Sequence, residues 1–347
     1  MKMIKGDKVA IVCCSNGQSE TKKKEIEKLK RVLEEIGLIP VLSKYIYQKS
    51  FQEKEQNQTE QRLVEQRIEE KEQNIIEQSR EKQNIIPFII PTPAESGLPE
   101  ERAAELMTFY KEDSIKAIFD ISGGDLANTV LPYLDYEQIA TANKQFWGYS
   151  DLTAIINAIY TKTGKTSVLY QVRNLLYENA KQQVKDFKET IFADASKESD
   201  RFKNNKSIDA AESGNQMGGL YDFLYKFCQG NALQGTVVGG NIRCFLKLAG
   251  TEYFPDLTDK ILLLEARSGS HAQLLTYLSQ LEQLGAFQKI KGIVLGTFTQ
   301  MEREQQKPDI YQLLRRYITP EMPVVKTQYI GHGMDSKAIE IGREYKF

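Results

Sequence analysis

Residues 146–164, FWGYSDLTAIINAIYTKTG, contain a step from strand to helix from which the rest of the chain can be understood. The apolar residues 146–149 predict a short strand, and the apolar spacing from residue 152 onward predicts a helix that ends at Gly164. Ser150 therefore lies in the turn, near the free N–H groups of a helix start, which can hold a developing oxyanion. This position suits a nucleophile, although Ser150 could instead be only the helix N-cap. Leu152 stands where the G-x-S-x-G nucleophile motif has its second glycine, so that motif is incomplete.

Strands and helices alternate before this stretch. We predict strands at residues 8–14, 38–42 and 115–122, and helices at residues 20–36 and 99–111. This alternation favours an α/β fold in which helices cover a parallel sheet. We therefore predict an N-terminal, flavodoxin-like α/β domain over residues 1–175.

The C-terminal part repeats the alternation on a smaller scale. The predicted strands are residues 235–241, 260–264, 290–298 and 324–330, and the predicted helices begin at His271 and Asp309. We expect a smaller α/β domain over residues 217–347, separate from the first and ending with the strand at residues 324–330. The charged, weakly patterned residues 176–216 are interpreted as the linker.

Residues 45–84 differ from the rest of the chain, because a polar phrase recurs there as EKEQN, EKEQNII and EKQNII. Apolar residues are too sparse in this stretch to form a core. We predict a charged helix or helical hairpin inserted into the N-terminal domain and projecting from it. The alternative is an arm that binds a partner or forms a dimer.

Composition excludes several classes of protein. The 46 Lys and Arg residues balance 47 Asp and Glu residues, which argues against binding to nucleic acid or to an anionic membrane. No apolar run resembles a signal peptide or a membrane span, so a cytoplasmic location is expected. The four cysteines form no C-x-x-C pair and no cluster with histidine, so we predict buried free thiols and neither a zinc site nor a disulfide framework. No site for a metal or an organic cofactor appears in the sequence, and we expect none.

Polar residues that could carry chemistry follow predicted strands. Ser150, Glu265 and His332 each stand at a strand end, where α/β folds form their ligand crevice. A serine nucleophile needs a base, and the base needs a third group to orient it. Glu265 could instead form an ion pair with Arg267 or Lys260.

Two further features are candidates with open roles. His271, the only other histidine, lies at a predicted helix start and is interpreted as a surface or supporting residue. Gly123 and Gly124 separate a strand from a helical stretch and can present backbone N–H groups to an anion. A phosphate loop is the alternative, although no Walker lysine follows the glycines.

The motifs GDKVAIVCCS, GGDLANTVLPYLD, KQFWGYSDLTAIINAIYTKTG, GTVVGGN, ILLLEA, IKGIVLGTF and YIGHG occur in this order. In these motifs the chain resembles the LD-carboxypeptidase family of serine peptidases, which includes the microcin C immunity peptidases. The resemblance covers nearly the whole chain outside residues 45–84.

The resemblance implies roles for the candidate residues. Ser150 would be the nucleophile, His332 the general base and Glu265 the residue that orients the base. The oxyanion hole would consist of the backbone N–H groups of Asp151 and Gly124, with Gly123 as an alternative to Gly124.

The chain also departs from the family pattern. Ser122 stands where the family usually has arginine, and Cys14 replaces a frequent proline. The tryptophans of the substrate loop in microcin-type members are absent, and Trp147, the single tryptophan, is expected in the core. The aromatic residues that could replace them are Tyr221, Phe223, Tyr225 and Phe227.

Three functions follow as expectations. The first is a cytoplasmic serine carboxypeptidase that cleaves the L,D-bond of a murein tetrapeptide and releases D-alanine. The second is a hydrolase of a peptide or aminoacyl nucleotide antibiotic, and the third is a non-catalytic binding protein with the same fold. The implied partners are a small peptide or peptide-nucleotide substrate and a second copy of the chain in a homodimer.

Overall fold

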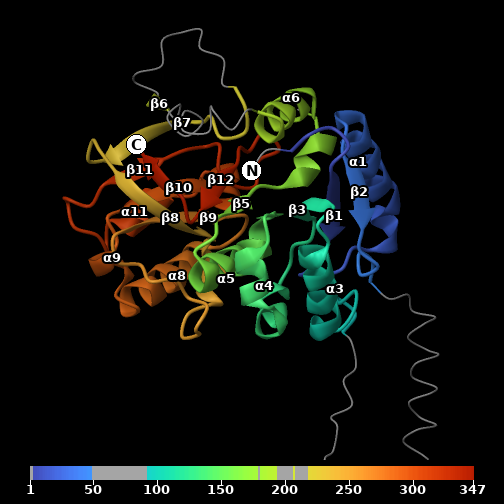
Figure 1. The fold of residues 1–347 in the computed structure, drawn as a ribbon. Coiled ribbons are helices and arrows are strands. Elements are labelled where there is room, and N and C mark those ends of the chain that lie inside the picture. The colour runs from blue at the N-terminus through green and yellow to red at the C-terminus, as the bar shows by residue number, and fades with distance from the viewer. Residues whose placement is uncertain (1–2, 49–91, 179, 194–205, 208–217) are drawn as a thin grey trace, which may run out of the picture.

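The computed structural model describes residues 3–48, 92–178, 180–193, 206–207 and 218–347. Most of the inserted segment predicted at residues 45–84 lies outside these ranges. Figure 1 shows two sheets that lie beside one another, each flanked by helices. The predicted pair of α/β units is thereby confirmed.

The first sheet is the predicted flavodoxin-like sheet. Its strands are β1 (Lys8–Val12), β2 (Ile39–Leu42), β3 (Ile115–Asp120), β4 (Gln145–Gly148), β5 (Ser167–Leu169) and β12 (Ile339–Ile341). They stand in the order β12-β5-β4-β3-β1-β2, and the pairings among β1 to β5 are parallel. The order 2-1-3-4-5 is that of doubly wound flavodoxin-like domains.

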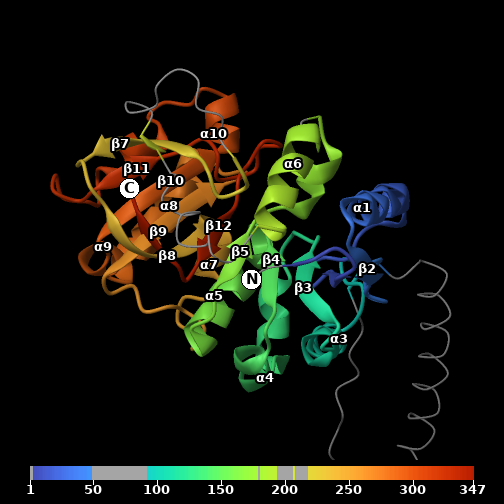
Figure 2. The ribbon, with the colours of Figure 1, turned by 45° about the horizontal axis from the view of Figure 1, so that its top comes forward.

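Helices cover both faces of this sheet (Figure 2). One face carries α1 (Lys23–Ile36), the 3₁₀ turn η4 (Val172–Leu176) and α6 (Ala180–Ile191). The other carries α3 (Pro99–Lys111), η2 (Ala127–Tyr133), α4 (Tyr136–Thr141) and α5 (Thr153–Thr163). Alternate side chains of β1 point to opposite faces. Val9 and Ile11 pack in the core beneath α1 and α6, whereas Ala10 and Val12 pack in the core beneath α3 and α5.

The second sheet has four parallel strands at its centre. Its strands are β6 (Lys206–Ser207), β7 (Leu224–Gln229), β8 (Gln234–Asn241), β9 (Lys260–Ala266), β10 (Gly292–Phe298), β11 (Val324–Lys326) and β13 (Glu344–Lys346). The order is β13-β8-β9-β10-β11-β7-β6. β13 pairs antiparallel with β8 and β7 pairs antiparallel with β11, whereas β6 pairs parallel with β7. The helices of this half are α7 (Ile242–Leu246), α8 (His271–Gln283), α9 (Ala286–Lys289), α10 (Thr299–Arg303) and α11 (Ile310–Leu314).

The expectation that the two halves are separate is wrong. The strand predicted at residues 324–330 stops at Lys326, and two more strands follow it. The first of these, β12, crosses to the N-terminal sheet and pairs antiparallel with β5, whereas β13 returns to the C-terminal sheet. Strands of three residues carry too little pattern to be recognised from sequence.

The interpretation of residues 176–216 as a linker is also corrected in part, because α6 lies inside that range. Phe187 and Ile191 of this helix are buried against the first sheet. The charged residues of α6 other than Asp186 face outward, so the composition of the segment does not reveal its apolar face.

A buried ion pair fastens the C-terminal segment to α6. Lys337 Nζ lies 2.5 Å from Asp186 Oδ2 and donates to the carbonyl of Gly219 at 2.9 Å, and both charged side chains are nearly inaccessible. We expect Lys337→Met to lower the free energy of unfolding by about 3–5 kcal/mol, because Asp186 would remain buried without its cation.

Urea denaturation would measure this loss. The matched control is Lys291→Met, which breaks a mostly exposed pair with Asp259 and should cost less than about 1 kcal/mol. Equal losses for the two variants would contradict the structural role of the buried pair.

Two smaller predictions can be compared with the structure. Cys13, Cys14 and Cys244 are buried free thiols as expected, whereas Cys228 is half-buried. Within the described ranges, none of the helices has the length and apolar character that crossing a membrane requires.

Candidate active site

Ser150 stands in a tight and unusual turn between β4 and α5. Its φ is +55°, a left-handed conformation that is uncommon outside glycine. The 3₁₀ turn η3 (Ser150–Leu152) then leads directly into α5. A Cβ at Gly148 would lie 2.6 Å from Leu152 Cβ. The turn therefore needs glycine at position 148, the first glycine of G-x-S-x-G, and accommodates leucine at position 152, where the motif has its second glycine.

The reading of Ser150 as a simple N-cap is wrong. The caps of the 3₁₀ turn and of α5 are Tyr149 and Leu152, and neither makes a side-chain capping bond. The Ser150 hydroxyl instead lies 3.2 Å from His332 Nε2. Ser150 is half-buried, and backbone strain held at such a hydroxyl is a feature of functional turns.

The structure brings together the three residues predicted from the strand ends. His332 Nδ1 lies 2.7 Å from Glu265 Oε2, so the imidazole bridges Ser150 and Glu265. The side chains of His332 and Glu265 are 7% and 0% exposed. Glu265 does not pair with Arg267 or Lys260, and its other oxygen, Oε1, has no hydrogen-bond partner among the described residues.

A glycine and an aromatic ring fix the position of the imidazole. Gly331, at φ +145°, precedes His332, and a Cβ there would lie 1.9 Å from Thr297 Oγ1. The ring of Tyr149 lies 4.4 Å from that of His332. Burial, and then the charge of Glu265, raise the pKa of Tyr149 well above its usual value, so the phenol stays neutral beside the histidine.

Asp151 and Gly124, the two residues predicted to form the oxyanion hole, each present an unpaired backbone N–H group. No hydrogen-bond acceptor for either N–H lies in the part of the chain that the structure describes. Gly124 has φ +121°, and a Cβ there would meet the Asn16 side chain at 2.4 Å. Glycine is therefore required at this position.

Asn16 holds the peptides on both sides of the Gly124 Cα. Its N–H donates to the carbonyl of Gly123 at 3.3 Å, and its Oδ1 accepts from the N–H of Asp125 at 2.9 Å. The N–H of Gly124 is left free between these two fixed groups. Sequence reasoning missed Asn16, although its place in the polar loop after a strand was a signal.

The remaining sequence candidates lie elsewhere. His271 begins α8, and its Nε2 lies 2.8 Å from the carbonyl oxygen of Pro308, so it does not join Ser150. Trp147 is buried and packs edge-on against Phe119, as expected of a core residue. Ser122 binds Asp120 and the N–H of Ser15, and so fastens the ends of β1 and β3 together.

The suggested aromatic substitutes for the missing tryptophans are mostly unavailable. Tyr221, Phe223 and Tyr225 are at most 7% exposed, and Phe227 packs partly buried against the same core. Burial of these rings contradicts the expectation that they form a stacking surface for a nucleotide.

Comparison with known proteins adds an independent observation. The model of the LD-carboxypeptidase N-terminal domain matches residues 66–171, and that of the LD-carboxypeptidase C-terminal domain matches residues 234–347. The chain belongs to the LD-carboxypeptidase family. The similarity noted in its motifs is thereby confirmed.

Curated relatives carry carboxypeptidase or immunity names. The chain is 33% identical to the putative carboxypeptidase YocD of Bacillus subtilis over 57% of this chain and 62% of that protein. It is 27% identical to the microcin C7 self-immunity protein MccF of Escherichia coli over 66% of this chain and 70% of that protein. It is 26% identical to a probable murein peptide carboxypeptidase of Bacillus subtilis over 71% and 73%.

Solved structures share the fold. Wild-type MccF in its apo state superposes with a TM-score of 0.73 at 21% identity, covering 99% of this chain and 94% of that one. A muramoyltetrapeptide carboxypeptidase from Oxalobacter formigenes gives a TM-score of 0.61 at 18% identity, covering 97% and 93%.

Proposed function

We propose that this LD-carboxypeptidase family member is a serine peptidase that hydrolyses an amide bond near the C-terminus of a small peptide. The observation that carries the proposal is His332, whose ring lies between the Ser150 hydroxyl and the buried Glu265 carboxylate. Nucleophile, base and orienting acid in this contact pattern are the parts of a catalytic triad. A binding protein has no need for all three.

The contacts support the following acylation steps. His332 Nε2 takes the proton of Ser150 as the serine oxygen attacks the amide carbon, and Glu265 accepts a hydrogen bond from Nδ1–H. The negative oxygen of the tetrahedral intermediate binds the free N–H groups of Asp151 and Gly124. The C–N bond then breaks, and His332 returns its proton to the leaving amine.

Deacylation uses the same groups in reverse. Water attacks the acyl-enzyme carbon while His332 takes one of its protons. Breakdown of the second intermediate frees the Ser150 oxygen, which regains a proton from His332, and releases the carboxylic acid. No redox partner enters this balance.

We propose the L,D-bond of a murein tetrapeptide as the substrate bond, with D-alanine as the leaving amine. Relatives named as murein peptide and muramoyltetrapeptide carboxypeptidases support this choice. The similarity to MccF, which has been solved with glutamyl sulfamoyl guanosine, favours an aminoacyl nucleotide as the second candidate. Cytoplasmic location and a homodimer stay predictions.

The first test is incubation of the full chain with a murein tetrapeptide, followed by mass spectrometry. We expect release of D-alanine, and little release from a control peptide that ends in L-alanine. A parallel incubation with glutamyl sulfamoyl guanosine tests the second candidate through release of glutamate. Release from neither substrate would count against both assignments.

A further inference from the structure

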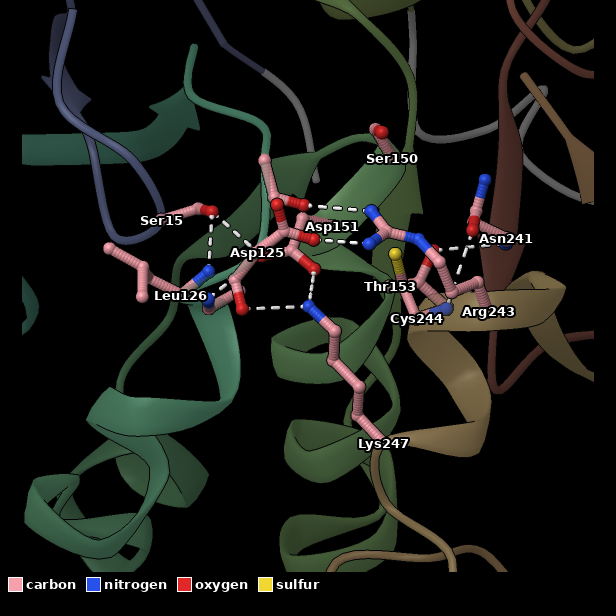
Figure 3. Close-up of polar contacts among 12 residues, drawn as sticks. Ser15, Asp125, Leu126, Ser150, Asp151, Thr153, Asn241, Arg243, Cys244 and Lys247 are labelled. Carbon is pink, nitrogen blue, oxygen red and sulfur yellow. Dashed lines mark hydrogen bonds and ion pairs between the residues drawn. The ribbon is translucent and has the colours of Figure 1, made fainter. Parts of the chain in front are cut away.

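Two cations from the C-terminal half reach the two turns that carry Gly124 and Asp151. They are Arg243 in α7 and Lys247 at the end of that helix, four residues apart and on one helix face. Figure 3 shows both side chains directed at Asp125 and Asp151 of the N-terminal half. Neither residue was singled out from the sequence, because their partners lie more than 90 positions away.

Lys247 neutralises the carboxylate of the residue that follows Ser150. Its Nζ donates to Asp151 Oδ1 at 2.5 Å and to the carbonyl of Asp125 at 2.8 Å. The Asp151 side chain is 0% exposed. A buried carboxylate that lost its cation would be strongly disfavoured, so Lys247 fixes where Asp151 can lie.

The other Asp151 oxygen fixes the same residue from two more sides. Oδ2 accepts from Ser15 Oγ at 2.7 Å and from the N–H of Ala127 at 2.8 Å. The carboxylate therefore joins the loop after β1, the start of η2 and α7. The backbone N–H of Asp151, which has no acceptor among the described residues, therefore points in a fixed direction.

Arg243 acts on the other donor. Its guanidinium donates to the carbonyl of Gly124 at 3.0 Å and forms an ion pair with the Asp125 carboxylate. The Gly124 carbonyl is thus held by Arg243 while Asn16 holds the groups on either side. Rotation of this loop, and with it of the Gly124 N–H, is opposed from both halves of the molecule.

We propose that Arg243 and Lys247 are positioning residues that set the geometry of the oxyanion hole from the opposite half of the chain. The inference rests on the proposed function. Donors to an oxyanion accelerate a reaction because they are oriented before charge develops, so loosening them raises the barrier without weakening substrate binding equally. The C-terminal half also supplies His332 and Glu265. The packing of the two halves therefore positions both the general base and the oxyanion hole.

The test compares Arg243→Gln and Lys247→Met with wild type on the substrate that wild type turns over. For each variant we expect kcat to fall about 10- to 100-fold with KM changed less than about threefold, below the full loss of one oxyanion donor. The inhibition constant of a peptidyl boronate, which forms a tetrahedral anion on serine, should rise by the same factor as kcat falls. Arg243→Lys should recover part of the loss.

Lys162→Gln is the matched control, because it breaks a partly exposed pair with Glu252 at the far end of α5. It should leave kcat, KM and boronate inhibition unchanged. If Lys247→Met fails to fold, Arg243→Gln decides, since its ion pair is half exposed and its loss should not prevent folding.

The outcomes separate the two proposals. Wild type without turnover of either substrate would overturn the proposed function, and the positioning role with it. Active wild type with unchanged kcat in folded Arg243→Gln and Lys247→Met would overturn the positioning role alone. A fall in kcat without the matching rise in the boronate constant would also overturn it, because a purely structural defect would act on the fraction of folded enzyme.

Discussion

Ser150→Ala is expected to lower kcat by about 10⁴- to 10⁶-fold on whichever amide substrate the wild type hydrolyses. Among the described residues, the alanine removes the only hydroxyl within hydrogen-bond distance of His332 Nε2, so the acyl-enzyme cannot form. Binding should change little, because the free N–H groups of Asp151 and Gly124 remain. Initial rates of amine release at saturating substrate measure the effect.

The double variant Ser150→Ala, His332→Ala sharpens this prediction. Residues that act as one unit lose their effect together, so the double variant should be no slower than Ser150→Ala within a few-fold. Ser19→Ala, at the exposed N-cap of η1, is the control serine and should retain wild-type kcat. Turnover by Ser150→Ala within tenfold of wild type would show that another group is the nucleophile.

The sequence indicated the three central residues because their signals are local. A strand end followed by a helix start predicts the turn at Ser150, and Glu265 lies next to the last residue of β9. His332 lies in the loop after β11, between two glycines that mark it in the sequence. The flavodoxin-like sheet could be predicted because strands and helices alternate along the chain, and several of them have strong apolar patterns.

The parts that the sequence did not reveal depend on contacts between distant residues. Lys247 lies on a five-residue helix, and only the packing of the two halves brings it to Asp151. The crossing of β12 to the first sheet is hidden for the same reason, since three residues carry no period of their own. The burial of the Tyr221 and Tyr225 rings was also not predicted, because composition alone does not reveal which aromatic side chains face solvent.

Glu265→Gln is expected to lower kcat by about 10³- to 10⁴-fold with the fold intact. The carboxylate accepts a hydrogen bond from His332 Nδ1 at 2.7 Å, which leaves Nε2 as the lone-pair nitrogen facing Ser150. A glutamine amide can donate to Nδ1 instead, and the proton then moves to Nε2. In that tautomer His332 cannot take the proton of Ser150.

Glu340→Gln is the control for this change, because Glu340 is also a buried carboxylate but pairs with Arg343. It should alter the urea midpoint and leave kcat unchanged, whereas Glu265→Gln should do the reverse. The contrast follows from placement, since among the described residues Glu265 Oε1 has no hydrogen-bond partner and Oε2 makes its one hydrogen bond with His332. If Glu265→Gln kept kcat within tenfold of wild type, the imidazole would have to be oriented by its neighbours Tyr149 and Gly331 alone, and Glu265 would not belong to the reacting set.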